Sequence, residues 1–172
     1  MKRAALLTLI FAIAAIGAQA QKFALIDMEY ILKNIPAYER ANEQLNQTSK
    51  KWQAEVEALT TRAKTLYTNY QNEMAFLSQA QKKEREQAIV DVEKQAGELK
   101  MKYFGPEGEL YKKRESLIRP IQDEIYNAVK NVADASRIQL VIDRSSDTAG
   151  IIFASPTIDI SNEVLGKLGY SN

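Results

Sequence analysis

The stretch Trp52–Leu77, WQAEVEALTTRAKTLYTNYQNEMAFL, decides the fold of this chain of 172 residues. Its large apolar residues, together with Leu45, recur at alternating spacings of three and four, which places them in a stripe along one side of a helix. They fill two heptad positions, namely Leu45, Trp52, Leu59 and Leu66 in one and Val56, Ala63, Tyr70 and Leu77 in the other. Most of the remaining residues of this helix are polar, so the stripe needs a partner helix to cover it.

The following segment supplies that partner. Ser78 stands three residues before Gln81, which is the spacing of a capping box at the start of a new helix. The same alternation of spacings then returns at Ile89, Val92, Ala96, Leu99 and Tyr103. We therefore expect a coiled-coil hairpin arm over residues 37–103 with its tip near residues 77–80.

Three short apolar runs flank this arm. Residues 23–28 (FALIDM) suit a buried strand, and residues 139–143 (QLVID) and 150–155 (GIIFAS) are rich in β-branched and aromatic residues. We expect the last two to pair as antiparallel strands. The sequence thus predicts a mainly α fold with a small β base (α+β), in which the long antiparallel helical hairpin is inserted in a small antiparallel sheet.

The helices outside the arm also have sequence signals. Asp27 is expected to cap a short helix after the first strand, and Ser161 to cap a last helix over residues 162–168 that Gly169 stops. A third apolar pattern runs from Leu110 to Val132, and Pro120 within it predicts a kink. These elements complete the base of the arm.

A sheet of three short strands is small for so long an insertion, and its open edges favour pairing with another chain. We therefore expect residues 21–36 and 104–172 to form an oligomerisation body. The side chains expected in it are the apolar residues of the strands, namely Phe23, Leu25, Leu140, Ile142, Ile151 and Phe153.

The first twenty residues indicate export. Lys2 and Arg3 precede an apolar run over residues 4–16, and AQA at residues 18–20 is a processing site, as in a signal peptide cleaved before Gln21. A membrane anchor is the alternative, but the run is shorter than the ~20 residues that span a bilayer. Removing residues 1–20 leaves 21 basic and 22 acidic residues. Such a balance lacks the basic excess of a nucleic-acid-binding protein, so we expect no nucleic-acid partner.

Catalysis is not indicated. The chain has no His and no Cys, and it has no glycine-rich phosphate loop or nucleophile motif. Four aspartates near the base, Asp27, Asp143, Asp147 and Asp159, suit caps and turns better than an active site. We expect no enzyme activity, no cofactor and no metal site.

The surface of the arm holds the candidate contact residues. Tyr67, Met74 and Phe76 fall off the heptad stripe, and exposed aromatic and thioether side chains suit contacts with varied unfolded clients. The alternative is that they contact the return helix or are exposed singly.

Three cations follow the expected tip. Lys82, Lys83 and Arg85 are candidates for contact with lipid phosphate head groups, but Glu84 and Glu86 weaken the local field. A solvated helix face is the simpler interpretation of this charge run.

Four segments resemble the Skp (OmpH-like) family of periplasmic chaperones. They are residues 23–27 (FALID), 110–122 (LYKKRESLIRPIQ), 140–143 (LVID) and 159–168 (DISNEVLGKL). The resemblance implies a homotrimer in which the sheets join into a β-barrel body and three arms enclose a cavity. It further implies an ATP-independent periplasmic holdase that binds unfolded outer-membrane proteins there and prevents their aggregation.

The charge of the chain departs from that resemblance. Members of the family are often strongly basic, which attracts acidic clients and anionic lipid, whereas this chain is nearly neutral. Contact with lipopolysaccharide or an anionic membrane is therefore disfavoured. The alternative function is a structural or adaptor coiled-coil protein of the cell envelope that binds a folded partner through the hairpin tip.

Overall fold

The structure is a computed structural model that describes residues 22–146 and 150–170. The expected signal peptide, residues 1–20, and Asp147 lie outside the described residues. The chain divides into two units, which we call the hairpin unit, residues 36–123, and the body unit, residues 22–35 and 124–170.

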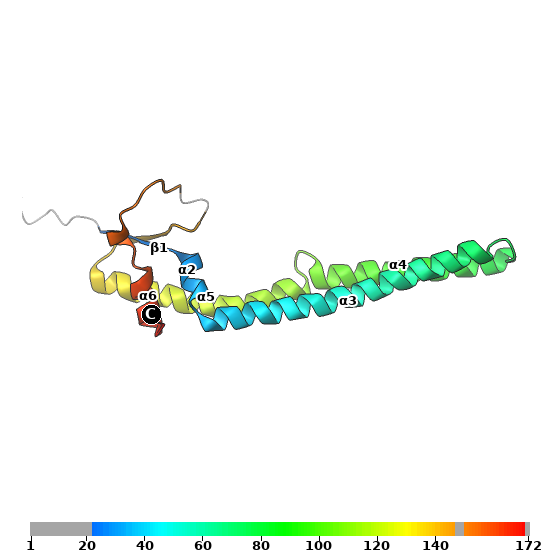
Figure 1. The fold of residues 1–172 in the computed structure, drawn as a ribbon, viewed down its shortest axis with the longest axis horizontal. Coiled ribbons are helices and arrows are strands. Elements are labelled where there is room, and N and C mark those ends of the chain that lie inside the picture. Colours follow the sequence, from blue (N-terminus) through cyan, green and yellow to red (C-terminus); the bar gives the residue numbers. More distant parts are fainter. Residues whose placement is uncertain (1–21, 147–149, 171–172) are drawn as a thin grey trace, which may run out of the picture. The chain divides into compact units, whose positions relative to one another are not determined.

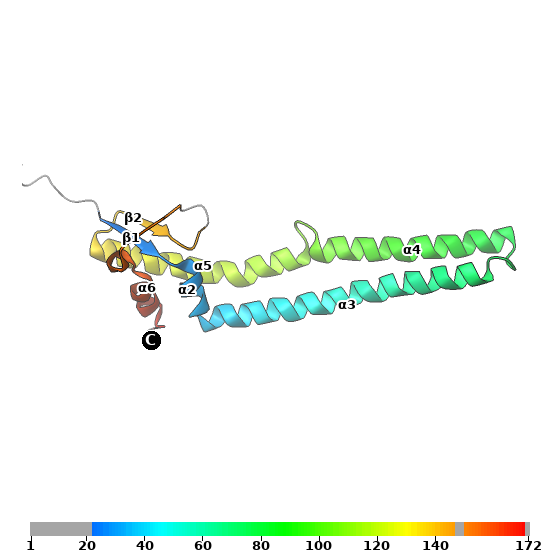
Figure 2. The same cartoon turned by 45° about the horizontal axis from the view of Figure 1, so that its top comes forward.

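The hairpin unit is built on two long helices. Helix α3 (Pro36–Glu73) and helix α4 (Gln79–Phe104) lie side by side and are joined by the turn 74–78, so they run in opposite directions (Figure 1). Helix α3 has 38 residues, which at ~1.5 Å per residue is about 57 Å. A short loop over residues 105–108 separates α4 from helix α5 (Glu109–Ser136) (Figure 2).

The ends of these helices follow from their sequence signals. The hydroxyl of Ser78 accepts from the backbone N–H of Gln81, and the side chain of Gln81 accepts from the backbone N–H of Ser78 at 2.9 Å. The predicted capping box is therefore confirmed, and it satisfies two of the N–H groups that a helix start leaves free. Gly105 is the residue at which α4 ends, and Pro106 after it cannot continue the helix.

Packing between α3 and α4 follows the predicted stripe. Ala63, Ile89, Val92 and Ala96 are buried, whereas the other stripe residues are half-buried. Two helices cover each other on one side only, so a large side chain at the seam keeps one flank in solvent. The hairpin unit therefore has a thin core.

The body unit contains a two-stranded sheet. Strand β1 (Phe23–Ile26) pairs with strand β2 (Leu140–Asp143) in parallel, with Phe23 opposite Leu140 (Figure 2). The predicted antiparallel sheet is wrong. Parallel neighbours need a long crossover connection, and the chain between β1 and β2 includes the whole hairpin.

The expected strand over residues 150–155 is also wrong, since residues 151–155 are irregular. The other edge of β1 is occupied instead by the segment around Asp159, which forms an isolated parallel bridge with Leu25. The N–H of Ile160 donates to the carbonyl of Leu25 at 2.9 Å. With that edge taken, the preceding apolar run has no place beside β1.

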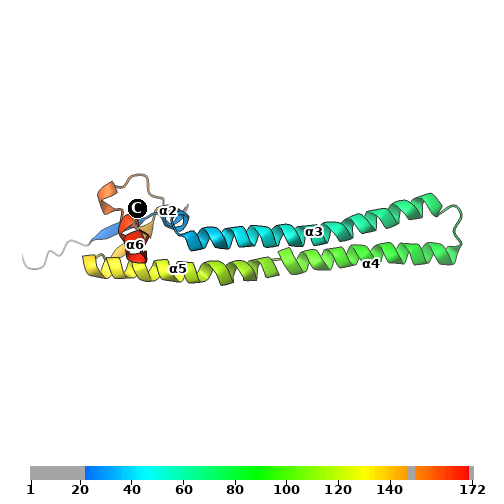
Figure 3. The same cartoon turned by 60° about the horizontal axis from the view of Figure 1, so that its bottom comes forward.

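Three short helical elements complete the body unit. Helix α2 (Met28–Lys33) packs against helix α6 (Ser161–Leu168), and the 3-10 turn η1 (Pro156–Ile158) precedes α6 (Figure 3). The core of the unit is formed by buried apolar side chains, including Leu25, Ile31, Ile125, Val164 and Leu165.

Two of the predicted caps have different outcomes. Asp27 accepts from the N–H of Tyr30 at 2.8 Å and caps α2, as predicted. Ser161 does not cap α6, because it is already the first helical residue and Ile160 occupies the cap position. The hydroxyl of Ser161 is instead used in contacts with Asp27 and Asp159, described below. Gly169, with φ of 85°, ends α6 as predicted.

Helix α5 continues through Pro120, and the kink at this residue stays a prediction. Among the described residues, no helix combines the length and the apolar character needed to cross a membrane.

Candidate functional site

The candidate contact residues of the arm are exposed. Tyr67 is 50% exposed, Met74 is 44% exposed, and Phe76, in the turn between α3 and α4, is 89% exposed. Tyr67 lies on α3 beside the buried seam, whereas Met74 and Phe76 lie beyond the end of α3, in the turn 74–78. The structure therefore leaves a large apolar side chain accessible at three positions in the distal part of the hairpin.

Tyr67 borders a groove of about 450 Å³ between α3 and α4. Its lining residues are Thr60, Ala63, Lys64, Tyr67, Glu93 and Ala96. The groove exists because the two seam residues in it are alanines, whose side chains fill little of the space between the helices. The periodicity places Tyr67 off the stripe but does not predict the groove, although the two alanines in a stripe of larger residues are its signal.

The basic residues after the tip lie among carboxylates that offset part of their positive charge. A guanidinium nitrogen of Arg85 lies 3.4 Å from a carboxylate oxygen of Glu73, which is a stripe position on α3. The phenol of Tyr70 donates to the carboxylate of Glu86, and this hydrogen bond raises the pKa of Tyr70 above its usual value. The ion pair with Glu73 uses one of the three cations, Arg85, that a phosphate-binding surface would need free.

A second set of cross-helix contacts lies nearer the base of the hairpin. The rings of Trp52 and Tyr103 stack with centroids 4.6 Å apart. The phenol of Tyr103 donates to the carboxylate of Glu55 at 2.6 Å, which raises the pKa of Tyr103. We call Trp52, Glu55 and Tyr103 the aromatic clip. It joins α3 to α4 with both a stacked pair and a charge-assisted hydrogen bond.

The six residues expected in the oligomerisation body have different exposures. Phe23, Leu140 and Phe153 are exposed, Ile142 and Ile151 are half-buried, and Leu25 is buried in the core. Leu25 therefore has no accessible side chain in a single copy of the chain.

The sequence prediction missed Ile152, which is 102% exposed, next to Phe153 at 85%. The signal was present: three consecutive apolar residues, 151–153, cannot all point to one side of an extended segment. An open pocket of about 500 Å³ also lies in this unit and is lined by Phe23, Ile138, Ile158 and Ile160 among others.

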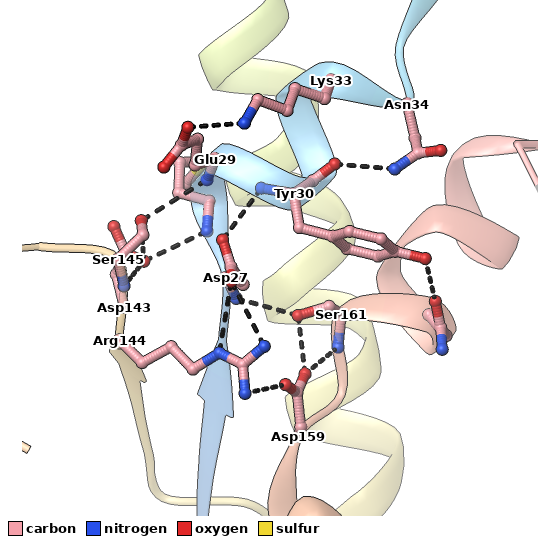
Figure 4. A network of polar contacts seen from close by, with 12 residues as sticks. Asp27, Glu29, Tyr30, Lys33, Asn34, Asp143, Arg144, Ser145, Asp159 and Ser161 are labelled. Atoms are coloured by element: carbon pink, nitrogen blue, oxygen red, sulfur yellow. Dashed lines mark hydrogen bonds and ion pairs between the residues drawn. The ribbon is translucent and has the colours of Figure 1, made fainter. Parts of the chain in front are cut away.

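Three of the four aspartates near the base form one polar network (Figure 4). Arg144 lies 3.2 Å from Asp27 and 3.0 Å from Asp159. The hydroxyl of Ser161 accepts from the N–H of Asp27 at 2.8 Å and donates to Asp159 at 2.6 Å. Asp143 accepts from the N–H of Met28 at 3.1 Å. These carboxylates fix backbone groups and one arginine, as expected for caps and turns.

No group of acidic residues within the described ranges has the arrangement of a metal site.

The fold defines a class of proteins in which a long helical hairpin is inserted between the two strands of a small α/β body. Residues 22–168 match the family model described as outer membrane protein (OmpH-like), and the chain belongs to this OmpH-like family. No curated protein matches the sequence.

A solved structure shares the fold. It is that of a candidate outer membrane chaperone (OmpH-like) from Caulobacter crescentus CB15, with a TM-score of 0.68. The two sequences are 12% identical, and the match covers 88% of this chain and 86% of that chain. At this identity the likeness concerns the fold alone.

Proposed function

We propose that this protein is an ATP-independent holdase of the periplasm, which binds unfolded outer-membrane proteins and prevents their aggregation. The observation that carries the proposal is the exposure of Tyr67, Met74 and Phe76 on a hairpin of an OmpH-like chain. A holdase acts by binding the unfolded chain and thereby lowering the concentration available for aggregation. Exposed apolar side chains on a long helical surface supply many weak contacts of that kind.

The proposal includes a homotrimer whose arms surround the client. Two features of the body unit support assembly through this unit. Strand β2 pairs with β1 only, so within the described chain its other edge is open, and Ile152 and Phe153 are exposed. An open strand edge beside exposed apolar residues favours contact with another copy of the chain. Several arms around one cavity would strengthen weak client contacts by multivalency.

The periplasmic location rests on residues 1–20 as a signal peptide, together with membership in the OmpH-like family. Lipopolysaccharide is not part of the proposal. Arg85 pairs with Glu73, and Glu84 and Glu86 flank it, so the tip presents little net positive charge.

The test is an aggregation assay with a urea-unfolded outer-membrane β-barrel protein that is diluted into buffer. The wild-type protein is expected to suppress light scattering when present at about the same concentration as the client. The triple variant Tyr67→Ser, Met74→Ser, Phe76→Ser is expected to lose most of this suppression, because it removes the exposed apolar surface of the distal hairpin.

The control removes exposed apolar side chains elsewhere, with Met101→Ser and Tyr126→Ser, and is expected to suppress scattering as the wild type does. Unchanged scattering with the wild-type protein would remove the holdase proposal.

A second candidate function is an adaptor of the cell envelope that binds one folded partner through the hairpin tip. The nearly complete exposure of Phe76 in the turn favours it. Recovery of a single folded protein by the wild type, lost in Phe76→Ser but not in Tyr67→Ser, would support the adaptor. A holdase would instead show graded losses in both variants.

A further inference from the structure

The hairpin unit contains a pocket that the proposed arm surface does not include. It has a volume of about 470 Å³ and lies where the chain leaves α4 and enters α5, opposite the first half of α3. Its apolar wall is formed by Leu45, Phe104, Pro106 and Leu110. The pocket is open to solvent, and its volume and mostly apolar lining fall within the range of small-ligand sites.

The loop that forms one wall has little freedom to change shape. A side chain at Gly105 would bring its Cβ within 2.4 Å of the carbonyl oxygen of Met101, and one at Gly108 within 2.7 Å of the carbonyl oxygen of Tyr103. Only glycine allows these close backbone approaches. The backbone of the loop therefore packs against the end of α4.

Phe104 is held in place from the other side. Its ring lies edge-on to the ring of Tyr103, with centroids 6.3 Å apart, and Tyr103 is itself stacked on Trp52. The aromatic clip thus supports the wall of the pocket. A pocket whose wall is already ordered loses little conformational entropy when a ligand binds.

The polar groups of the pocket favour an anion. Arg114 is the only charged residue in its lining, and this guanidinium makes no ion pair with any described residue. Asn46 and Ser49 lie on the α3 side of the pocket and add hydrogen-bonding groups. An arginine presents paired N–H donors that match the two oxygens of a carboxylate.

We infer that this pocket binds the carboxyl-terminal residue of a polypeptide, with its apolar or aromatic side chain in the pocket and its α-carboxylate on Arg114. The inference rests on the proposed function to the extent that the ligand is an unfolded polypeptide. Internal segments of a chain lack the carboxylate, so the pocket would select chain ends. Asn46 and Ser49 suit the amides of a peptide backbone, whereas the acyl chain of a lipid would leave them without partners.

The experiment titrates the full-length protein with a short peptide that ends in Phe with a free carboxylate, and with the same peptide as a carboxyl-terminal amide. Trp52 is the single tryptophan of the chain and lies in the aromatic clip, so its fluorescence reports on the pocket. Calorimetry measures the affinity independently. The acid is expected to bind about tenfold more tightly than the amide, because only the acid forms the charge-assisted contact.

Arg114→Gln is expected to remove the difference between acid and amide, and Arg119→Gln, an exposed arginine on the same helix outside the pocket, to preserve it. Equal affinities of acid and amide for the wild type, or no binding of either, would overturn the inference. Binding of dodecanoate at the pocket with no binding of the peptide would assign it to a lipid and overturn the inference as well.

The aggregation assay separates the two proposals. Suppression of aggregation without peptide selectivity would retain the holdase and remove the pocket assignment. Selective peptide binding without suppression of aggregation would retain the pocket assignment and remove the holdase.

Discussion

Among single residues, Ser161 has a central part in joining the start of α6 to the end of β1. It is 3% exposed, and its hydroxyl satisfies the backbone N–H of Asp27 while donating to Asp159. Arg144 joins the same two aspartates through its guanidinium. One hydroxyl and one arginine thus connect β1, the turn after β2 and the start of α6.

The variant Ser161→Ala is expected to lower the free energy of unfolding of the protein by about 1–3 kcal/mol, the cost of leaving buried hydrogen-bonding groups without a partner. The measurement is urea unfolding followed by far-UV circular dichroism. Ser136→Ala is the control, because Ser136 is exposed in the same unit. The same unfolding midpoint in both variants would contradict the role given to Ser161.

At the scale of elements, the contact between α3 and α4 combines a thin apolar seam with specific polar contacts. Ala63 and Ala96 leave little apolar surface at the middle of the seam. The aromatic clip lies on the basal side of this gap, and the Tyr70–Glu86 hydrogen bond and the Glu73–Arg85 ion pair lie on the distal side. The two helices are therefore joined on both sides of the groove that Tyr67 borders.

The clip gives the hairpin a pH dependence. Tyr103 must be protonated to donate to Glu55, and its pKa in the folded state is raised above the usual value near 10. This contribution to stability is fully present below the pKa of the unfolded state and is lost as the pH rises through the raised pKa of the folded state. We therefore expect Tyr103→Phe, which keeps the stacking ring, to lower the melting temperature more near about pH 8 than at roughly pH 11.

Thermal unfolding monitored by circular dichroism at both pH values measures this effect. Tyr126→Phe, at an exposed tyrosine in α5, is the control and is expected to match the wild type at both. A difference between Tyr103→Phe and the wild type that stays the same at the two pH values would contradict the assignment.

At the scale of the whole molecule, the body unit carries more exposed apolar surface than a single copy would need. Phe23, Leu140, Ile152 and Phe153 are all exposed, and β2 has an open edge within the described residues. Burying such surface between copies would contribute about 25 cal/mol per Å² removed from water. Assembly is therefore expected to depend on this unit.

The double variant Ile152→Asp, Phe153→Asp is expected to have the mass of one chain in multi-angle light scattering, whereas the wild type is expected to have the mass of the proposed trimer. Two carboxylates in an apolar interface would lose hydration without gaining partners. Phe76→Asp, at the tip of the hairpin, is the control and is expected to remain assembled. A wild-type protein with the mass of one chain would contradict the prediction.

The hairpin could be predicted from the sequence. The stripe from Leu45 to Leu77, the Ser78–Gln81 capping box and the stop at Gly105 all act between residues a few positions apart, so their effect can be read locally. The exposure of Tyr67 followed from the same periodicity, whereas Met74 and Phe76 are exposed because they lie in the turn between the helices. The role of Asp27 as a cap was local as well.

The strand pairing of the body unit and the positions of the pockets depend on contacts between distant parts of the chain, so they could not be predicted from the sequence. The segments 139–143 and 150–155 were predicted to pair with each other. Instead β2, in the first of them, pairs with β1. The segment around Asp159 occupies the other edge of β1, which residues 150–155 would need. Arg144 meets Asp27 across 117 positions of sequence, and Ser161 meets it across 134. Pairings at such separations depend on the complete arrangement of the chain, because neither local propensity nor periodicity distinguishes one distant partner from another.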